Sequence, residues 1–127
     1  MNGILTDAGY FRVHPVRIVG ARVVPPNYLK VPEKMEMLCE QMQATHDPIG
    51  CVMQHAWFEA IHPFADGNGR LGRLLLNYQL LRAGFPLLII RSERKNRYYD
   101  VLEEAQTGQV YQPLLEFACE ELVASTQ

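Results

Sequence analysis

The run Gly67-Asn68-Gly69 places two glycines directly before a stretch with helical character. Glycine allows the backbone to approach a ligand closely, and the first N–H groups of a helix have no acceptor within that helix. Such a turn can therefore bind an anion. The same turn is also a common plain connection between two helices, so the side chains around it must decide between the two interpretations.

Two arginines, Arg70 and Arg73, follow in the first turn of that helix and share one face at positions i and i+3. The helix dipole disfavours cations at this end by about 0.3–1 kcal/mol each, unless an anion is bound there. Guanidinium groups match phosphate oxygens, and the backbone amides of the Gly-Asn-Gly run complete a cradle. The pattern predicts a polyphosphate site. A simple ion pair between Asp66 and Arg70 is the structural alternative.

Two further side chains beside this loop are suited to phosphoryl chemistry. Asp66 offers a hard oxygen ligand, and Mg²⁺ is usually held by one or two carboxylates together with substrate phosphates and water. An N-cap role for Asp66 is the competing interpretation. His62 ends the preceding helical stretch. A neutral imidazole with a pKa of about 6.5 could accept a proton from an attacking hydroxyl group, although loop histidines also serve structural roles.

Other site chemistries do not match the sequence. The spacing of His46, His55 and His62 fits no zinc pattern, and no pair of cysteines accompanies them. The glycines are too close together for a Walker loop, whose Lys-Ser/Thr ending is also missing. There is no Gly-x-Ser-x-Gly elbow of a hydrolase either. The loop therefore indicates a different nucleotide chemistry.

Composition limits the class of protein further. The 127 residues, 48% of them hydrophobic, suit one globular domain. The 12 Lys and Arg residues are outnumbered by 14 Asp and Glu residues, so the net charge of −2 creates no overall field for nucleic acid or an anionic membrane. A short basic stretch at 91–97 is interrupted by Glu93 and fits the solvated start of a helix. We expect no nucleic-acid partner.

Three cysteines, Cys39, Cys51 and Cys119, lie far apart in apolar helical stretches, so we expect reduced, buried thiols. The N-terminus lacks the basic start and apolar core of a signal peptide. No apolar run reaches the ~18 residues that a membrane span needs. These features predict a cytoplasmic protein without a membrane partner.

The elements that must position the loop are mostly helical. Branched and apolar residues from Val13 to Val24, with Gly20 at the centre, predict a β-hairpin that Pro25 and Pro26 end. Apolar residues recur at helical spacing in the stretches 33–45, 47–61, 70–83, 98–106 and 113–123. The expected fold class is a mostly α domain with one hairpin.

The loop region resembles the complete Fic-family signature, in which His, Phe, an acidic residue, Gly-Asn-Gly-Arg and a final Arg recur at fixed spacing. The matching run is His62-Pro63-Phe64-Ala65-Asp66-Gly67-Asn68-Gly69-Arg70-Leu71-Gly72-Arg73. The resemblance extends to the segments 9–12, 16–26, 31–35, 83–86, 98–99 and 102–110. It implies a single Fic domain over residues 1–127, a compact helical bundle with a β-hairpin flap over the active site.

For the chemistry, the resemblance implies a protein adenylyltransferase, which moves AMP from ATP to a Ser, Thr or Tyr hydroxyl of a target protein or of the chain itself. His62 would be the general base and Asp66 the Mg²⁺ ligand. The backbone of Gly67–Gly69 would hold the α- and β-phosphates, and Arg70 with Arg73 the β- and γ-phosphates. These roles agree with those suggested by the residue types.

The resemblance also implies a base pocket and a docking flap. Tyr98 or Tyr99 would form the adenine wall, with simple helix packing as the alternative. Gln106 stands where many relatives have Asn, which keeps an amide to read the base, and ATP remains the expected nucleotide. Phe64 would anchor the motif loop. The flap, which would pair with the target as a strand, would consist of Val16, Arg17, Ile18, Val19, Gly20, Ala21, Arg22, Val23 and Val24.

Many relatives carry an inhibitory helix with Ser or Thr four positions before a Glu, which pairs with the second motif arginine, here Arg73. No Ser or Thr in this chain has a Glu four positions later. Relatives usually have helices before the flap. The inhibitory glutamate would then come from a separate protein or from such an upstream segment. We expect neither kinase activity nor AMP removal. The alternatives left open are a catalytically silent nucleotide-binding or interaction module, and transfer of a different nucleotide.

Overall fold

The structure is a computed structural model that describes residues 9–18 and 22–125. Helices dominate these residues, and none of them belongs to a β-strand. The α-helices are α1 (Val31–Ala44), α2 (Pro48–Ile61), α3 (Asn68–Arg82), α4 (Lys95–Gly108) and α5 (Gln112–Ser125), and the short 3-10 turns η2 (Tyr28–Lys30) and η3 (Ser92–Arg94) precede α1 and α4. No helix in the described part of the chain is long and apolar enough to cross a membrane.

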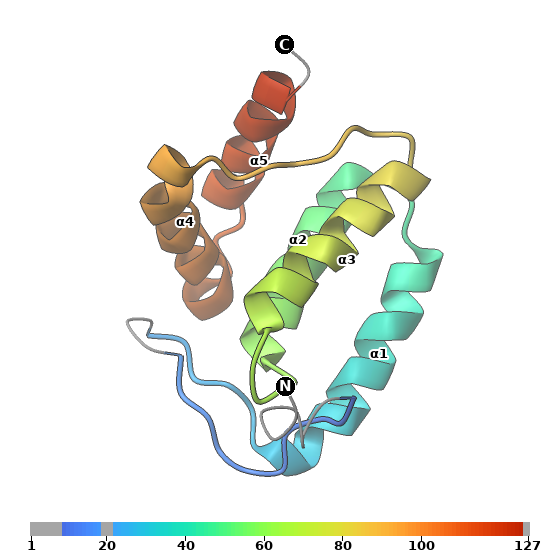
Figure 1. The fold of residues 1–127 in the computed structure, drawn as a ribbon, viewed down its shortest axis with the longest axis vertical. Helices are drawn as coiled ribbons and strands as arrows, with labels where there is room; N and C mark the ends of the chain where they lie inside the picture. The colour runs from blue at the N-terminus through green and yellow to red at the C-terminus, as the bar shows by residue number, and fades with distance from the viewer. Residues whose placement is uncertain (1–8, 19–21, 126–127) are drawn as a thin grey trace.

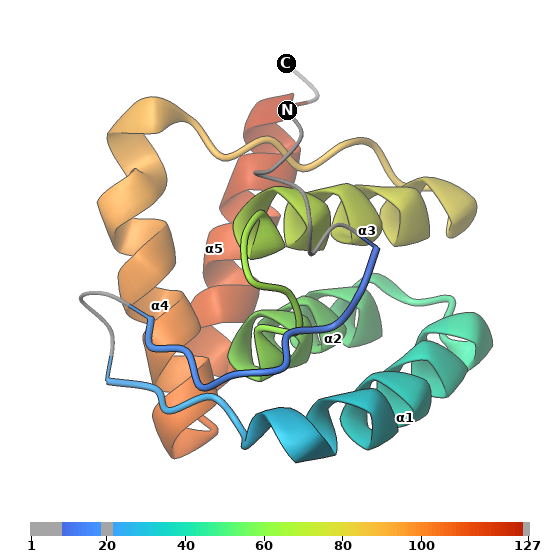
Figure 2. The same cartoon turned by 60° about the horizontal axis from the view of Figure 1, so that its bottom comes forward.

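Helix α2 lies at the centre and contacts α1, α3, α4 and α5. Figures 1 and 2 show α1 on one side of the α2–α3 pair and α4 with α5 on the other, reached by the long connection after α3. One face of α2 supplies Val52 and Ala56 to a core shared with α3, α4 and α5. The other supplies Phe58 and Ile61 to a second core with α1. Burial on two faces explains why residues 48–61 are apolar almost all round.

Local signals set where the helices begin. Asp47 caps α2, because its carboxylate accepts a hydrogen bond of 2.7 Å from the Gly50 N–H. Helix α3 begins at Asn68, earlier than the expected Arg70. The reason is Gly67, whose φ of 79° is left-handed and turns the chain directly into the helix. The Gly-Asn-Gly run is therefore partly helical itself.

The predicted β-hairpin flap is not confirmed, because its described arms are not strands. Its expected turn, Val19–Ala21, lies outside the described residues. The first arm is anchored through Arg12 to the end of α2. The second is anchored through Arg22, whose backbone N–H and guanidinium both bond the Glu103 carboxylate on α4. Pro15 in the first arm, and Pro25 with Pro26 directly after the second, lack the backbone N–H that a ladder needs. In the described arms, anchoring to the helical body takes the place of strand pairing.

The cysteine prediction is correct only in part. All three are free thiols and Cys51 is buried, but Cys39 and Cys119 are exposed. Each exposed cysteine follows a buried residue, Leu38 or Ala118. One helical step of about 100° turns the next side chain away from the core, so a place in an apolar stretch does not guarantee burial.

A buried carboxylate ties α5 to the segment before α4. Glu121 has 0% exposure and accepts hydrogen bonds from Arg91 at 2.9 and 3.1 Å and from Arg94 at 2.8 Å. The hydrogen bonds from Arg91 lower the pKa of Glu121 most strongly, against the opposing effect of burial. Arg94 also lies over the Phe117 ring, 4.9 Å from its centroid. These contacts fix α4 against α5.

We expect Glu121→Gln to lower the free energy of unfolding by about 2–3 kcal/mol at neutral pH, less than a fully buried pair would lose because both arginines keep some solvent contact. The depressed pKa stabilises the fold above the ordinary glutamate pKa, and this stabilisation is lost as pH falls through the folded-state pKa. Urea titrations at neutral and acidic pH measure both effects. Glu120→Gln, an exposed neighbour, is the control, and equal losses in the two variants would contradict the assignment.

Candidate active site

The loop between α2 and α3 is held by its own side chains. Helix α2 ends at His62, whose φ of 51° and ψ of 60° are left-handed and whose N–H bonds the Phe58 carbonyl at 3.0 Å. Inside the loop, the buried Asn68 amide donates to the Phe64 carbonyl at 2.8 Å and accepts from the Phe64 N–H at 2.9 Å. The Phe64 ring packs on the second core, 5.5 Å from the Phe11 ring between centroids. Phe64 anchors the loop as expected.

The N-terminus of α3 faces the end of this loop with unpaired donors. The Gly67 carbonyl accepts the first bond of the helix, from the Leu71 N–H at 3.0 Å. The N–H groups of Asn68, Gly69 and Arg70 precede that bond and so have no acceptor within the helix. The first turn of α3 contains no acidic residue. The helix dipole and these donors together favour an anion at this end.

Asp66 makes none of the contacts that its structural alternatives require. Gly67 occupies the N-cap position of α3, with no capping bond from a side chain. Within the described residues, no ion pair joins Asp66 to Arg70, and both side chains are exposed. Both groups are therefore available to a ligand.

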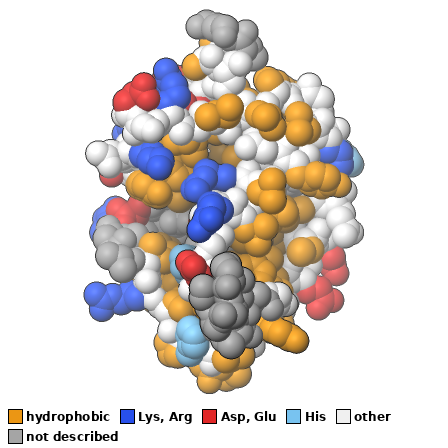
Figure 3. Space-filling view, viewed as in Figure 1, with side chains coloured by type: hydrophobic (Ala, Val, Ile, Leu, Met, Phe, Trp, Pro, Cys, Tyr) orange, Lys and Arg blue, Asp and Glu red, His pale blue; other side chains and the backbone are white. Residues whose placement is uncertain are grey.

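A cavity of about 430 Å³ opens between α2, α3 and α4. The space-filling view shows Lys and Arg side chains gathered between α3 and α4, in the middle of the face that it displays (Figure 3). Four of the predicted site residues, Asp66, Gly67, Asn68 and Arg70, are not part of the cavity wall. The predicted residues that do line it are His62, Gly69, Arg73, Tyr98, Tyr99 and Gln106, joined by Ile18 of the first arm.

Glu59 is a further residue of the cavity wall, which the motif does not reveal. It lies on α2 one turn before His62, is buried, and has no described hydrogen-bond partner for Oε2. Burial raises the pKa of Glu59 to about 7, against the opposing charge of Arg73. Its carboxylate lies against Gly72, where a β-carbon would meet Oε2 at 2.2 Å. The available signal was a lone acidic residue in the apolar run 56–61, where burial makes a carboxylate costly.

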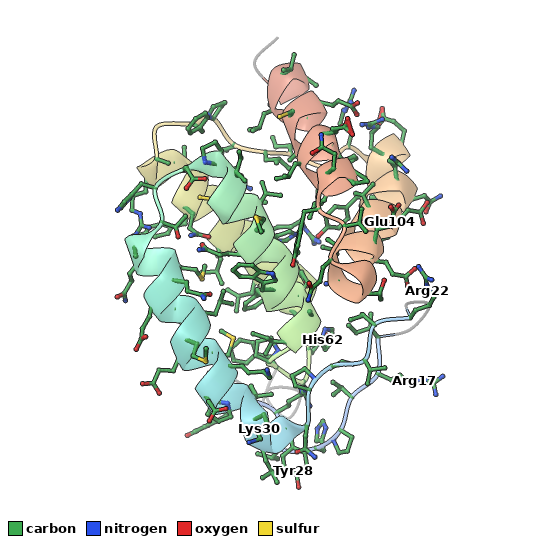
Figure 4. The ribbon with its side chains drawn as sticks, turned by 180° about the vertical axis from the view of Figure 1, so that it is seen from behind. Arg17, Arg22, Tyr28, Lys30, His62 and Glu104 are labelled. Atoms are coloured by element: carbon green, nitrogen blue, oxygen red, sulfur yellow. The ribbon has the colours of Figure 1, made fainter. Side chains whose placement is uncertain are left out.

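The imidazole of His62 is held in the neutral form that a general base needs. Burial lowers the pKa of His62, the positive charge of Arg12 lowers it further, and a hydrogen bond to the Glu59 backbone opposes both. Figure 4 shows His62 at the end of α2, beside the segment that carries Arg17 and Arg22. At neutral pH the ring can therefore accept a proton.

Arg12 holds the first arm to the end of α2. Its buried guanidinium donates to the carbonyls of His62 and Pro26, each at 2.7 Å, and to the Ile61 carbonyl at 3.2 Å. Its backbone N–H bonds the Pro63 carbonyl at 2.9 Å. The last carbonyls of a helix have no N–H donor within that helix, so one arginine satisfies those of Ile61 and His62 and positions His62 as well.

The residues predicted for the base pocket differ in exposure. Tyr98 is only 3% exposed, and its hydroxyl lies 2.6 Å from Nε2 of His55. Tyr99 is 53% exposed, and the two tyrosine rings lie 5.1 Å apart between centroids. Gln106 donates from Nε2 to the Ala56 carbonyl at 3.1 Å, so part of its amide is already used by α2.

The donor set fits a magnesium ion that the substrate completes. Among the described residues, no three or more His, Cys, Asp or Glu side chains are grouped to hold a metal. Asp66 is an exposed, unpaired carboxylate beside the helix N-terminus. One carboxylate together with phosphates and water is the usual surrounding of protein-bound Mg²⁺.

Known proteins match this chain in sequence. The sequence profile of the Fic/DOC family matches residues 1–80. Protein adenylyltransferase Fic of Culex quinquefasciatus is 42% identical over 78 residues, which are 61% of this chain and 15% of that protein. Protein adenylyltransferase fic-1 of Caenorhabditis elegans is 33% identical over 124 residues, 95% of this chain and 24% of that protein. The chain thus spans less than a quarter of the length of these relatives.

Solved structures share the arrangement of helices. A Fic domain containing signaling protein from Bacteroides thetaiotaomicron superposes with a TM-score of 0.77 at 25% identity, covering 91% of this chain and 51% of that one. A Fic family protein from Desulfovibrio desulfuricans gives a TM-score of 0.74 at 31% identity, covering 96% of this chain and 41% of that one.

We expect His62 to titrate below the ordinary histidine pKa of about 6.5 in NMR spectra, because burial and the Arg12 charge both disfavour the imidazolium. Arg12→Met should raise this pKa, whereas Arg12→Lys, which keeps the charge, should change it less. His62→Ala assigns the signal. A His62 pKa above the ordinary value would mean that the ring is more solvated than the structure indicates.

Proposed function

This chain belongs to the Fic/DOC family, and we propose that it transfers AMP from ATP to a hydroxyl side chain of a protein. The observation that carries the proposal is the meeting of His62, Gly69 and Arg73 in one cavity wall, at the end of α3 that has unpaired N–H groups. The names of the relatives support it, since both are protein adenylyltransferases. The proposed catalytic unit is a single domain of residues 1–127.

In this reaction the acceptor oxygen bonds to the α-phosphorus of ATP while the bond from that phosphorus to the α,β-bridging oxygen breaks. AMP stays on the protein and pyrophosphate leaves. His62 takes the proton of the acceptor hydroxyl. Its place in the cavity wall and its lowered pKa support this role. A Ser, Thr or Tyr hydroxyl of a target, or of the chain itself, suits the same chemistry.

The phosphates would lie against the N-terminus of α3. Backbone N–H groups of Gly67, Asn68 and Gly69 receive the α- and β-phosphates, and Arg70 with Arg73 contacts the β- and γ-phosphates from one face. The absence of an acidic residue from the first turn of α3 supports this assignment. These fixed donors stabilise the negative charge that grows on the departing pyrophosphate.

Mg²⁺ bound by Asp66 and the phosphates would neutralise charge on the leaving group. At the other end of the nucleotide, Tyr98 or Tyr99 would form the adenine wall, together with Gln106. The exposed ring of Tyr99 offers a stacking surface, and the amide of Gln106 suits the edge of a base. These groups make ATP the proposed nucleotide.

The segment Val16–Val24 would dock the target protein. An extended target segment pairs with the backbone of such a flap and brings its hydroxyl to the α-phosphate. The described arms have no strand partner, so their backbone groups, apart from the Arg22 N–H that bonds Glu103, stay available for a target. Ile18 reaches the cavity wall. Regulation would act on Arg73, through an inhibitory glutamate from a separate protein or from another segment of a longer protein.

We expect His62→Ala to reduce labelling of protein by ATP labelled at the α-phosphorus about 10²–10⁴-fold, while ATP binding persists, because only the general base is lost. The assay contains Mg²⁺ and a cell lysate. His46→Ala, an exposed histidine outside the cavity, is the matched control. ATP labelled at the γ-phosphorus should leave no label, because that phosphate departs with pyrophosphate. Equal labelling by His62→Ala and the unaltered protein would sink the proposal.

Asp66→Ala should raise the Mg²⁺ concentration needed for half-maximal transfer by about tenfold, because it removes the carboxylate that complements the phosphate ligands. Glu40→Ala, which removes an exposed carboxylate on α1, is the control and should leave the Mg²⁺ dependence unchanged. Measured at saturating ATP, an unaltered Mg²⁺ dependence in Asp66→Ala would exclude Asp66 as the ligand.

A further inference from the structure

A buried chain of hydrogen bonds runs from the centre of the molecule to the cavity. His55 is buried on α2, and its ring joins two other helices. Its Nδ1 lies 3.2 Å from the Gly72 carbonyl on α3, and its Nε2 lies 2.6 Å from the Tyr98 hydroxyl on α4. Neither contact has a part in the reaction proposed above.

The partners determine where the protons lie in this chain. The Gly72 carbonyl can only accept, so Nδ1 of His55 carries the proton. Burial lowers the pKa of His55 to about 4, so the ring is neutral at pH 7 and Nε2 is an acceptor. The Tyr98 hydroxyl must then donate to Nε2. The tyrosine oxygen keeps only lone pairs for any other neighbour.

Arg73 is the cation beside that oxygen. Arg73, Tyr98 and Tyr99 line both the cavity of about 430 Å³ and an adjoining one of about 340 Å³, so they form the partition between the two. The Arg73 guanidinium lies over Gly69, where a β-carbon would be 3.3 Å from Nη1. Burial raises the pKa of Tyr98, and Arg73 opposes this rise through its charge and a hydrogen bond.

We propose that His55 and Tyr98 are positioning residues for Arg73, in which the Tyr98 oxygen accepts from the guanidinium and holds it over Gly69 to meet the outer phosphates of a nucleoside triphosphate. A long arginine side chain loses rotamer freedom when it binds a ligand, and holding it beforehand reduces that cost. The proposal rests on the proposed function for the identity of the ligand. The proposal also gives the two tyrosines different roles. Tyr98 positions the arginine that binds the outer phosphates, and Tyr99 forms the adenine wall.

The exposure of the two rings supports this division. Stacking on a base needs an accessible ring face, and Tyr98 retains only 3% of its surface, whereas Tyr99 retains 53%. Tyr98 also contacts the Phe117 ring, 6.0 Å away between centroids, on its side toward α5. The hydroxyl is therefore the part of Tyr98 through which it acts on the site.

The first test separates phosphate binding from base binding. Tyr98→Phe removes one oxygen and keeps the ring. Calorimetry measures its affinity for α,β-methylene-ATP, which cannot transfer AMP, and for AMP. We expect the affinity for the triphosphate analogue to fall about tenfold, the equivalent of one hydrogen bond to a charged group, and that for AMP to change less than about twofold. Tyr78→Phe, an exposed tyrosine on α3, is the matched control.

Two further variants show through which residue the effect passes. In an Arg73→Ala background, Tyr98→Phe should have no additional effect on the affinity for the analogue. His55→Ala should lower the same triphosphate-to-AMP affinity ratio, and adding Tyr98→Phe should not lower it further. Equal losses for both ligands in Tyr98→Phe, or a full effect that persists without Arg73, would overturn the positioning role.

NMR without nucleotide tests the contact independently of the proposed function. In proton–nitrogen spectra, Tyr98→Phe should shift and broaden the Arg73 Nε–H signal, because the guanidinium loses its acceptor. An unchanged signal would overturn the positioning role even if ATP binds well. A signal that moves in a protein that binds neither nucleotide would reject the proposed function and support the contact.

Discussion

Helix α2 is enclosed on two faces, by α1 on one side and by α3, α4 and α5 on the other. A helix in this position cannot direct its polar side chains to bulk water, so each must find a partner inside or open into a cavity. Gln54 bonds Thr45, and His55 bonds Tyr98. Glu59 instead lines the cavity, and one oxygen of its carboxylate has no described hydrogen-bond partner. The candidate site lies where the polar residues of the central helix emerge.

The sharp reversal after α2 brings two helix ends together. Left-handed residues stand on both sides of the loop, at His62 and at Gly67, and the Asn68 side chain closes the loop through two hydrogen bonds to Phe64. A helix C-terminus carrying an imidazole thereby lies next to a helix N-terminus carrying unpaired amides. From the sequence we expected only the backbone N–H of Asn68 to act, as a phosphate donor. Its side chain also stabilises the loop, through both hydrogen bonds to Phe64.

Charge at the N-terminus of α3 favours an anion, although the cavity wall beside it also carries Asp100 and Glu103. Arg70 and Arg73 stand at the positive end of α3 without an acidic residue in its first turn. Burial brings the pKa of Glu59 to about 7, so this carboxylate compensates the arginines less than an ordinary glutamate would. The N-terminus of α3 is therefore locally positive in a chain whose net charge is −2.

The proximity of residues 62–73 could be predicted from the sequence because they are neighbours along the chain. Their spacing alone places them on one loop and one helical turn. The helices followed from apolar periodicity for the same reason, with boundaries shifted where Gly67 adopts a left-handed conformation. The hairpin flap was not confirmed, because its described arms are not strands and alternation predicts a strand only where a partner completes the ladder. Only the tertiary structure brought Arg12 to the end of α2, Glu59 to the cavity, and His55 to Tyr98. These pairs are distant in sequence or depend on which helix faces are covered, and packing between helices, rather than local propensity, decides both.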